Sequence, residues 1–98
     1  MVAYLVLIAE VNDPETYKEY SSRTPPIIKK YGGRFLVRGG EVDTIEGELF
    51  NDRLVILVFP SKRAIHDMFS DLEYQAAGEY RKSSSKARIL AVDGISEL

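Results

Sequence analysis

Two arginines beside a pair of glycines are the strongest candidates for chemistry in this sequence. Arg34 and Arg38 stand at positions of the same parity in a short apolar segment, and Gly39 and Gly40 follow directly. If the apolar residues between the arginines face a core, both guanidinium groups lie on the other side of the strand, where Arg38 can approach Glu10. Arg38 could then hold the carboxylate or enolate of a small ligand, with the glycines allowing close approach to the backbone. The alternative, which we favour at this point, is an interface salt bridge beside a bulge.

Three tyrosines form a second candidate site. Tyr17, Tyr20 and Tyr31 fall on the side of a predicted helix that faces the core. Ligand pockets in such folds lie between helix and sheet, where a phenol can donate a hydrogen bond to a ligand. Aromatic residues at helical spacing more often serve plain core packing, and we favour that interpretation for all three.

The one histidine is a weaker candidate. His66 is followed by Asp67, which invites a catalytic interpretation, and a haem ligand is the other role considered for it. Neighbouring helical residues point about 100° apart, and the apolar stripe that includes Ile65 and Met68 directs His66 towards solvent. We therefore expect a surface histidine. With no cysteine and a single histidine, the chain cannot form a thiolate or multi-histidine metal site, and we expect no metal and no cofactor.

Length and charge limit the function classes further. The chain has 98 residues, so we expect a single domain over residues 1–98. Its net charge of −2 offers no field that would attract nucleic acid or an anionic membrane, and we expect neither partner. The apolar run 2–9 is too short for a membrane span and lacks the features of a signal peptide, which predicts a cytoplasmic protein.

The hydrophobic pattern predicts the order strand, helix, strand, strand, helix, strand. The expected strands are 2–11, 34–38 with an extension past a glycine bulge through 41–46, 54–59 and 87–93, and the expected helices run from Asp13 to Gly32-Gly33 and from Ser61 to Lys82. Pro25-Pro26 should break the first helix near Thr24, which would cap its second half, and Ser70-Asp71 can restart the second helix. The expected inward stripe of that second helix is Ile65, Met68, Phe69, Leu72, Ala76, Ala77 and Tyr80.

This order indicates an α+β fold, a ferredoxin-like βαββαβ sandwich with two helices on one face of an antiparallel sheet. The first and third strands are apolar on both faces, with Leu5, Leu7, Val55, Leu57 and Phe59 on one side and Tyr4, Val6, Ile8, Leu54, Ile56 and Val58 on the other. Two helices cover only one side. At about 25 cal/mol per Å² of apolar area, leaving the second face in water would forgo several kcal/mol, so we expect a homodimer joined sheet to sheet.

Several motifs spread along the chain resemble one family. They are Tyr4, the Asp13-Pro14-Glu15 cap with Tyr17 and Tyr20, the glycine-framed segment 32–41, Phe59-Pro60-Ser61 and Glu73-Tyr74-Gln75. Together they resemble the domain-of-unknown-function family numbered 1330. The resemblance implies the dimeric α+β barrel superfamily, in which two ferredoxin-like units join their sheets, and whose relatives include cofactor-independent monooxygenases, lactone isomerases and haem enzymes.

Two kinds of function remain open. The first is a metal-independent enzyme acting on a small carbonyl-bearing or aromatic molecule, with Arg38 stabilising an anion and a tyrosine orienting the ligand. The second is a non-catalytic module for small-ligand binding or assembly, in which the dimer is the functional unit.

Overall fold

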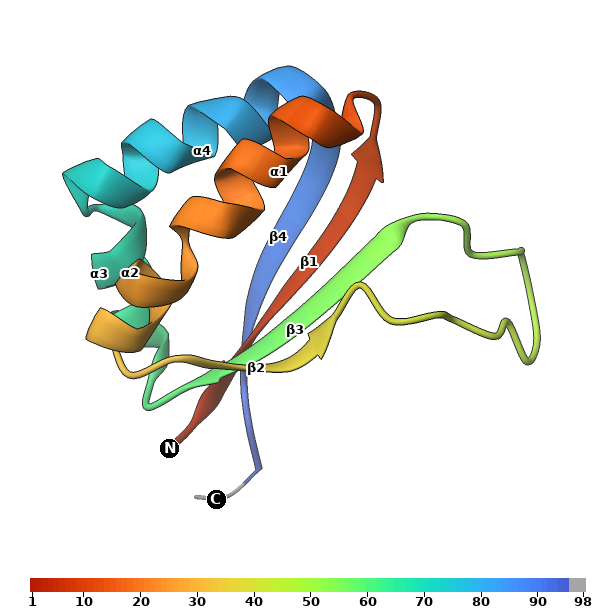
Figure 1. Cartoon of the computed structure of the whole chain (residues 1–98). Helices are drawn as coiled ribbons and strands as arrows, with labels where there is room; N and C mark the ends of the chain where they lie inside the picture. Colours follow the sequence, from red (N-terminus) through yellow and green to blue (C-terminus); the bar gives the residue numbers. More distant parts are fainter. Residues whose placement is uncertain (96–98) are drawn as a thin grey trace.

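Four antiparallel strands and four short helices make up the part of the chain that the structure, a computed structural model, describes, which is residues 1–95. The strands are β1 (Ala3–Val11), β2 (Arg34–Arg38), β3 (Arg53–Phe59) and β4 (Ser85–Asp93), and the helices are α1 (Pro14–Arg23), α2 (Pro25–Lys30), α3 (Lys62–Phe69) and α4 (Leu72–Ser84). The sheet order is β2-β3-β1-β4, and all four helices lie on one face of it (Figure 1). The expected ferredoxin-like βαββαβ fold is confirmed, with each of its two helices divided into two.

The alternation of apolar residues along the central strands positions the core. Leu5 pairs with Leu57 and Leu7 with Val55 across β1 and β3, and all four side chains are buried beneath the helices. Phe59 at the end of β3 is 1% exposed. The helices pack against this face of the sheet.

Local chemistry explains where each helix begins. The Asp13 side chain accepts a hydrogen bond from the Thr16 N–H and caps α1, and Asp71 caps α4 in the same way. The break at Thr24 is confirmed, but the Thr24 side chain is buried and makes no capping hydrogen bond with α2. The restart at Ser70-Asp71 is also confirmed.

The restart changes the face that the last helix presents to the core. Leu72, expected to point inward, is 80% exposed, and Ala76 is exposed as well. The residues of α4 that are buried instead are Tyr74, Ala77, Gly78, Arg81 and Ser84. Because α4 starts afresh at Asp71, its rotation does not continue that of α3, and a single stripe drawn through both helices points in the wrong direction after the break.

No helix within residues 1–95 is long and apolar enough to cross a bilayer.

Residues 39–52 form a loop and not the expected extension of the second strand. The ladder between β2 and β3 ends at Arg38 and Val55, and beyond it the chain leaves the body of the domain (Figure 1). The loop carries Glu41, Asp43, Glu46, Glu48 and Asp52 with no lysine or arginine. Aspartate and glutamate have low strand propensity, and none of these residues joins the ladder between β2 and β3.

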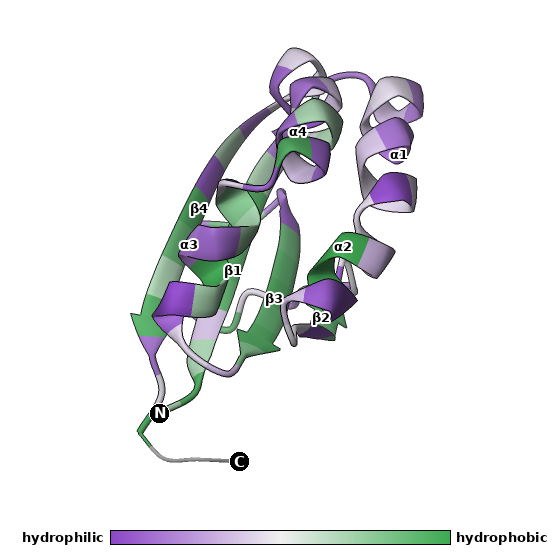
Figure 2. Ribbon diagram, turned by 90° about the vertical axis from the view of Figure 1, so that its left-hand side faces the viewer, coloured by the Kyte–Doolittle hydropathy of each residue, from purple (hydrophilic) through white to green (hydrophobic). Residues whose placement is uncertain are grey.

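The second face of the sheet is apolar and has no helix over it. We name as the outer face the side chains of Tyr4, Val6, Ile8, Leu54, Ile56, Leu90 and Val92 together with Arg34 and Arg88, which the strand register places on one side. Its central row runs from Ile56 through Val6 to Leu90, and Leu90 and Val92 remain 47% and 51% exposed. In the ribbon of Figure 2, hydrophobic residues dominate the central strands, whereas the helices alternate between hydrophilic and hydrophobic residues. Val58 lies on this side as expected, opposite Tyr4 in the register, but it is already buried in the single chain.

Candidate functional site

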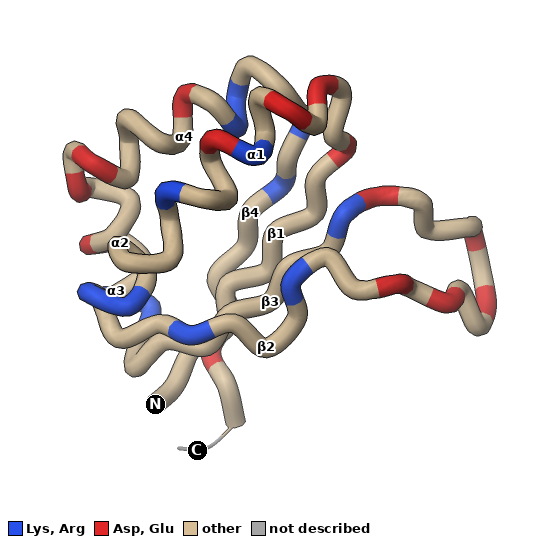
Figure 3. The backbone as a smooth tube through the Cα atoms, in the orientation of Figure 1, with Lys and Arg blue, Asp and Glu red and all other residues tan. Residues whose placement is uncertain are grey.

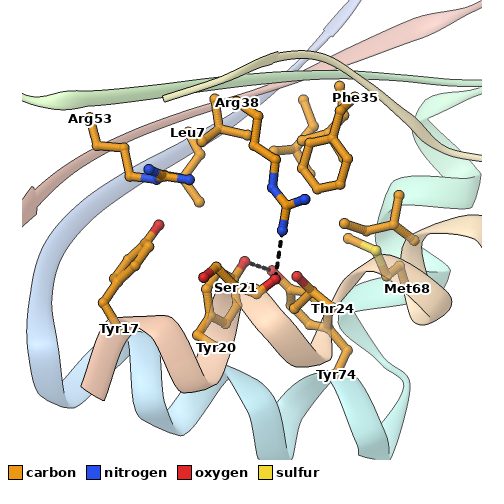
Figure 4. Close-up of a pocket in the computed structure, with 14 residues that line it drawn as sticks. Leu7, Tyr17, Tyr20, Ser21, Thr24, Phe35, Arg38, Arg53, Met68 and Tyr74 are labelled. Carbon is orange, nitrogen blue, oxygen red and sulfur yellow. Dashed lines mark hydrogen bonds between the residues drawn. The ribbon is translucent and has the colours of Figure 1, made fainter. Parts of the chain in front are cut away.

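A small pocket lies between α1 and the half of the sheet formed by β2 and β3 (Figure 4). Its apolar lining consists of Leu5, Leu7, Ile28, Phe35, Val55, Leu57 and Met68, and its polar lining of Tyr17, Tyr20, Ser21, Thr24, Arg38, Arg53 and Tyr74. The centres of water molecules can occupy about 30 Å³ of this space. The pocket in this conformation therefore has room for water but not for an aromatic ring.

Arg38 belongs to this pocket because of a β-bulge. Phe35 pairs with Leu57 and Arg38 with Val55, so one extra residue, Leu36, separates the two pairs on β2. The extra residue shifts the alternation, and Arg38 faces the helices together with Phe35. The expectation that Arg38 points to the same side as Arg34 is wrong for this reason.

The contacts of Arg38 agree with this orientation. Its Nη2 donates to the backbone oxygen of Ser21 on α1 at 2.7 Å, and its guanidinium carbon lies 4.4 Å from the centre of the Phe35 ring. Glu10 lies on the alternate positions of β1, on the other side of the sheet, and forms no ion pair with Arg38 in this chain. Arg38 is thus held by one neutral carbonyl and one ring.

Arg53 is a second cation at the pocket that the sequence interpretation missed. It is the first residue of β3, and its guanidinium carbon lies 5.6 Å from the centre of the Tyr17 ring. Its Nε is buried without a hydrogen-bond partner. The parity of Arg53 with the inward residues Val55 and Leu57 could have revealed it, because a strand keeps its alternation where no bulge intervenes.

Gly39 provides the space in which the Arg53 guanidinium lies. Gly39 has φ +72, and a Cβ built on it would collide with Nη1 of Arg53. Its N–H donates to the backbone oxygen of Leu54 at 2.8 Å, which holds the backbone in place. Gly40 has nothing within 4 Å of a built Cβ. Of the two glycines, only Gly39 is required by its surroundings, and what approaches its backbone is Arg53.

The tyrosines divide between the pocket and the helix surface. Tyr17 and Tyr20 line the pocket, and the Tyr20 hydroxyl lies 2.6 Å from that of Tyr74, which comes from α4 (Figure 4). Tyr31 lies away from the pocket, where its hydroxyl donates to Oδ2 of Asp71 at 2.6 Å. Tyr74 was missed because the stripe assumed for the second helix excluded it.

Burial keeps the pocket phenols protonated. Desolvation raises the pKa of Tyr17, although the nearby Arg53 opposes this change. Desolvation and the neighbouring Tyr20 raise the pKa of Tyr74 far above its usual value. Both hydroxyls are therefore hydrogen-bond donors at neutral pH.

A third arginine, which is buried, lies beside the Tyr20 ring. Arg81 on α4 is 8% exposed, its guanidinium carbon is 5.3 Å from the centre of the Tyr20 ring, and its Nε has no hydrogen-bond partner. Within residues 1–95, no carboxylate forms an ion pair with Arg38, Arg53 or Arg81. The pocket and its surroundings thus carry uncompensated positive charge. His66 is exposed on α3 and is not part of this pocket.

Comparison with known proteins identifies the family. The family described as "Domain of unknown function (DUF1330)" matches residues 2–95. The chain belongs to this family. No curated protein matches this DUF1330 sequence.

Solved structures share the fold at low sequence identity. The RPA0582 protein of unknown function from Rhodopseudomonas palustris has 17% identity and a TM-score of 0.81, covering 98% of this chain and 84% of that one. A protein of unknown function from Jannaschia sp., described as dimeric and ferredoxin-like, has 13% identity and a TM-score of 0.73, covering 96% and 100%. SnoaB from Streptomyces nogalater, a cofactor-independent oxygenase, has 14% identity and a TM-score of 0.65, covering 99% and 96%. These structures support the fold of this DUF1330 chain.

Proposed function

We propose that this DUF1330 protein binds a small aromatic or carbonyl-bearing organic anion between α1 and the sheet and acts on it as an enzyme. The observation that carries the proposal is the convergence of Arg38 and Arg53 on an apolar pocket without any carboxylate partner in residues 1–95. The Nε of Arg53 is buried without a hydrogen-bond partner, so this guanidinium gains much from a bound carboxylate or enolate, because little water is present there to compete.

Each group of the pocket lining has a role in the proposed binding. The apolar side chains at its base suit a ring or an alkyl chain, and the arginines suit the anionic end of the molecule. The Tyr17 phenol, beside Arg53, can donate to a carbonyl oxygen and orient it. When charge develops on such an oxygen, as it does in enolate formation, fixed guanidinium groups nearby stabilise it. The pocket lining contains no carboxylate and no histidine, so the proton that leaves the carbon next to the carbonyl would pass to a water molecule or hydroxide ion of the solvent. The proposal includes no bound metal or cofactor.

Entry of the ligand requires Arg38 to move. Its guanidinium lies over the pocket, bonded to the Ser21 carbonyl, and the remaining space holds only water. A carboxylate forms a stronger, charge-assisted hydrogen bond than a neutral carbonyl does. Arg38 can therefore exchange its hydrogen bond with the Ser21 carbonyl for one with a bound anion. Arg53, which lies beside Gly39 and Tyr17, would not have to move.

A melting-temperature screen tests the proposal. Benzoate, phenylpyruvate and related carboxylates would be added to the unmodified protein, to Arg38→Met and Arg53→Met, and to Arg63→Met as a control for loss of one exposed cation. At about a hundred times Kd a ligand adds ~2.7 kcal/mol of stability, and each kcal/mol raises Tm by about 4–8 °C in a domain of this size. We expect the shift with the unmodified protein and the control only. An equal shift in all four proteins, or no shift with any compound, would contradict the proposal.

Catalysis is tested separately from binding. A bound carbonyl compound that becomes an enolate exchanges the hydrogens next to its carbonyl with solvent, and NMR in D₂O measures that exchange. We expect faster exchange with the unmodified protein than with Arg38→Met. Binding without accelerated exchange or other turnover would favour the non-catalytic ligand-binding module.

The uncovered sheet face supports a second proposal, a homodimer joined sheet to sheet. The outer face of one chain offers Val6, Ile56 and Leu90 in one row, and a second copy can cover it with the same residues. The neighbour from Jannaschia sp. is described as dimeric. Sedimentation should give twice 11.1 kDa at micromolar concentration. Leu90→Asp should lower this to one chain, whereas the control Leu72→Asp, on an exposed position of the helix layer, should not.

A further inference from the structure

The loop between β2 and β3 carries acidic residues without ion-pair partners and apolar residues that are largely exposed. We name residues 39–52 the acidic arm. Its acids, marked in red in Figure 3, are spread along both of its sides, and none of them forms an ion pair within residues 1–95. Ile45 and Leu49 near its tip are 92% and 69% exposed.

A hydrogen bond within the acidic arm holds its tip together, although the arm extends away from the rest of the domain. The Phe50 N–H donates to Oγ1 of Thr44 at 2.9 Å, across the base of the tip. Gly47, with φ +94, makes the turn between the two sides. The turn places Ile45 and Leu49 on its flanks, and the arm projects away from the helices and the sheet (Figure 1). Two large apolar side chains that are largely exposed at a formed tip indicate a contact with another molecule.

Charge excludes the anionic partners. The arm carries only acidic charged residues, so nucleic acid and anionic lipid surfaces would repel it. The complementary surface must be apolar with positive charge at its margin. The outer face of this chain has that composition, because Arg34 and Arg88 flank its apolar rows and neither forms an ion pair in residues 1–95.

Continuity with the sheet also favours a second copy. The arm connects β2 to β3, two of the strands that form the outer face, so a chain that covers this face lies next to the base of the arm. The first chain's arm then extends past the edge of its own sheet and alongside the covering chain.

We propose that the acidic arm grips the second copy of this chain, with Ile45 and Leu49 packed at the margin of that copy's outer face and the arm's carboxylates beside its arginines. This inference rests on the homodimer proposed above. The symmetric dimer would contain two such contacts, each burying apolar residues that are largely exposed in the single chain.

A comparison of two tip substitutions with a control tests the contact. The double variant Ile45→Asp, Leu49→Asp places charge at the tip, and Leu72→Asp introduces the same residue at a position that is 80% exposed on α4. Sedimentation equilibrium would measure the dimer dissociation constant of each, and circular dichroism would verify the fold. We expect the tip variant to raise the dissociation constant at least tenfold and the control to leave it unchanged. Equal constants for the tip variant and the unmodified protein would overturn the inference.

Cross-linking locates the tip. Because the chain has no cysteine, Ile45→Cys provides a single attachment site for a photoactivatable cross-linker. In a mixture of ¹⁵N-labelled and unlabelled protein, mass spectrometry distinguishes links between copies from links within one chain. We expect links between copies that reach residues of the sheet. Links confined to one chain, or between copies at the helices, would overturn the inference.

The two proposals fail in different ways. If the unmodified protein sediments as a single chain, the homodimer is wrong and the arm contact falls with it. If it sediments as a dimer while the tip variant dissociates no more readily than Leu72→Asp, the homodimer stands and only the arm contact is wrong.

Discussion

Substitution of Gly39 by alanine should displace the Arg53 guanidinium while changing the free energy of unfolding little more than a control substitution does. A Cβ at this residue meets Nη1 of Arg53, and the backbone has φ +72. Two other glycines provide matched controls. Gly47 has φ +94 with open space around a built Cβ, and Gly40 has neither positive φ nor a neighbour within 4 Å.

The magnitudes follow from these differences. Alanine in the left-handed region costs roughly 1–2 kcal/mol, so Gly47→Ala should be destabilised by this amount and Gly40→Ala hardly at all. Overpacking against a rigid neighbour would add about 1–3 kcal/mol in Gly39→Ala. Because the colliding atom is the end of a flexible side chain, we expect the guanidinium to rotate away, and Gly39→Ala to differ from Gly47→Ala by less than ~1 kcal/mol.

Two measurements test this reasoning. Urea denaturation gives the free energies of unfolding, and the ¹⁵N resonance of the Arg53 Nε reports the position of the guanidinium beside Tyr17. We expect a large shift of this resonance in Gly39→Ala alone, together with loss of any ligand-induced rise in Tm. An unmoved resonance in Gly39→Ala, or the same shift in Gly40→Ala, would refute the role assigned to Gly39.

Two further predictions concern the buried phenols and a helix cap. Tyr20→Phe leaves the Tyr74 hydroxyl without its partner and should cost about 1–3 kcal/mol; the further change Tyr74→Phe should then cost less than it does alone, by ~0.5–3 kcal/mol, and strict additivity in urea denaturation would count against the pair. Hydrogen bonds from Tyr31 and Lys30 lower the pKa of Asp71 from 3.8 to about 2. The stability that this carboxylate provides should therefore be fully present above about pH 4 and be lost as the pH falls towards 2, so the difference in Tm between the unmodified protein and Asp71→Asn should shrink over that range, and a constant difference would contradict this origin.

The fold could be predicted because its signals are local patterns of neighbouring residues. The apolar runs of the first and third strands, the Asp13-Pro14 cap and the break at Pro25 each depend on residues adjacent in the chain. Such signals remain valid whatever the rest of the molecule does. They were sufficient to predict the element order and the inner face of the sheet.

The arrangement of the site depends on two local features that change which side chains face the core but leave no recognisable signal in the sequence. The bulge at Leu36 reversed the side of Arg38, and the new helix start at Asp71 turned Tyr74 inward and Leu72 outward. Neither shift is visible from alternation alone, because an extra residue in a strand looks like any other residue. Arg53 obeys its strand's alternation and was overlooked because a charged residue at a strand end is usually assigned to solvent.

The bulge makes the side on which Arg38 lies a matter of strand register. Deleting Leu36, the extra residue, would restore strict alternation and leave Arg38 opposite Val55 and facing the helices. Pairing all five residues of β2 without a bulge would instead turn Arg38 outward beside Arg34. The apolar face would then gain a second cation of the same strand, and the pocket would lose one of its two, without any amino acid being replaced. During descent, loss of the bulge at constant strand length could therefore convert an arginine that contacts a ligand into one that contacts another subunit. For chains related to this one, the number of residues between Arg34 and Arg38, taken together with the presence of the bulge, says more about the arginine's role than its identity does.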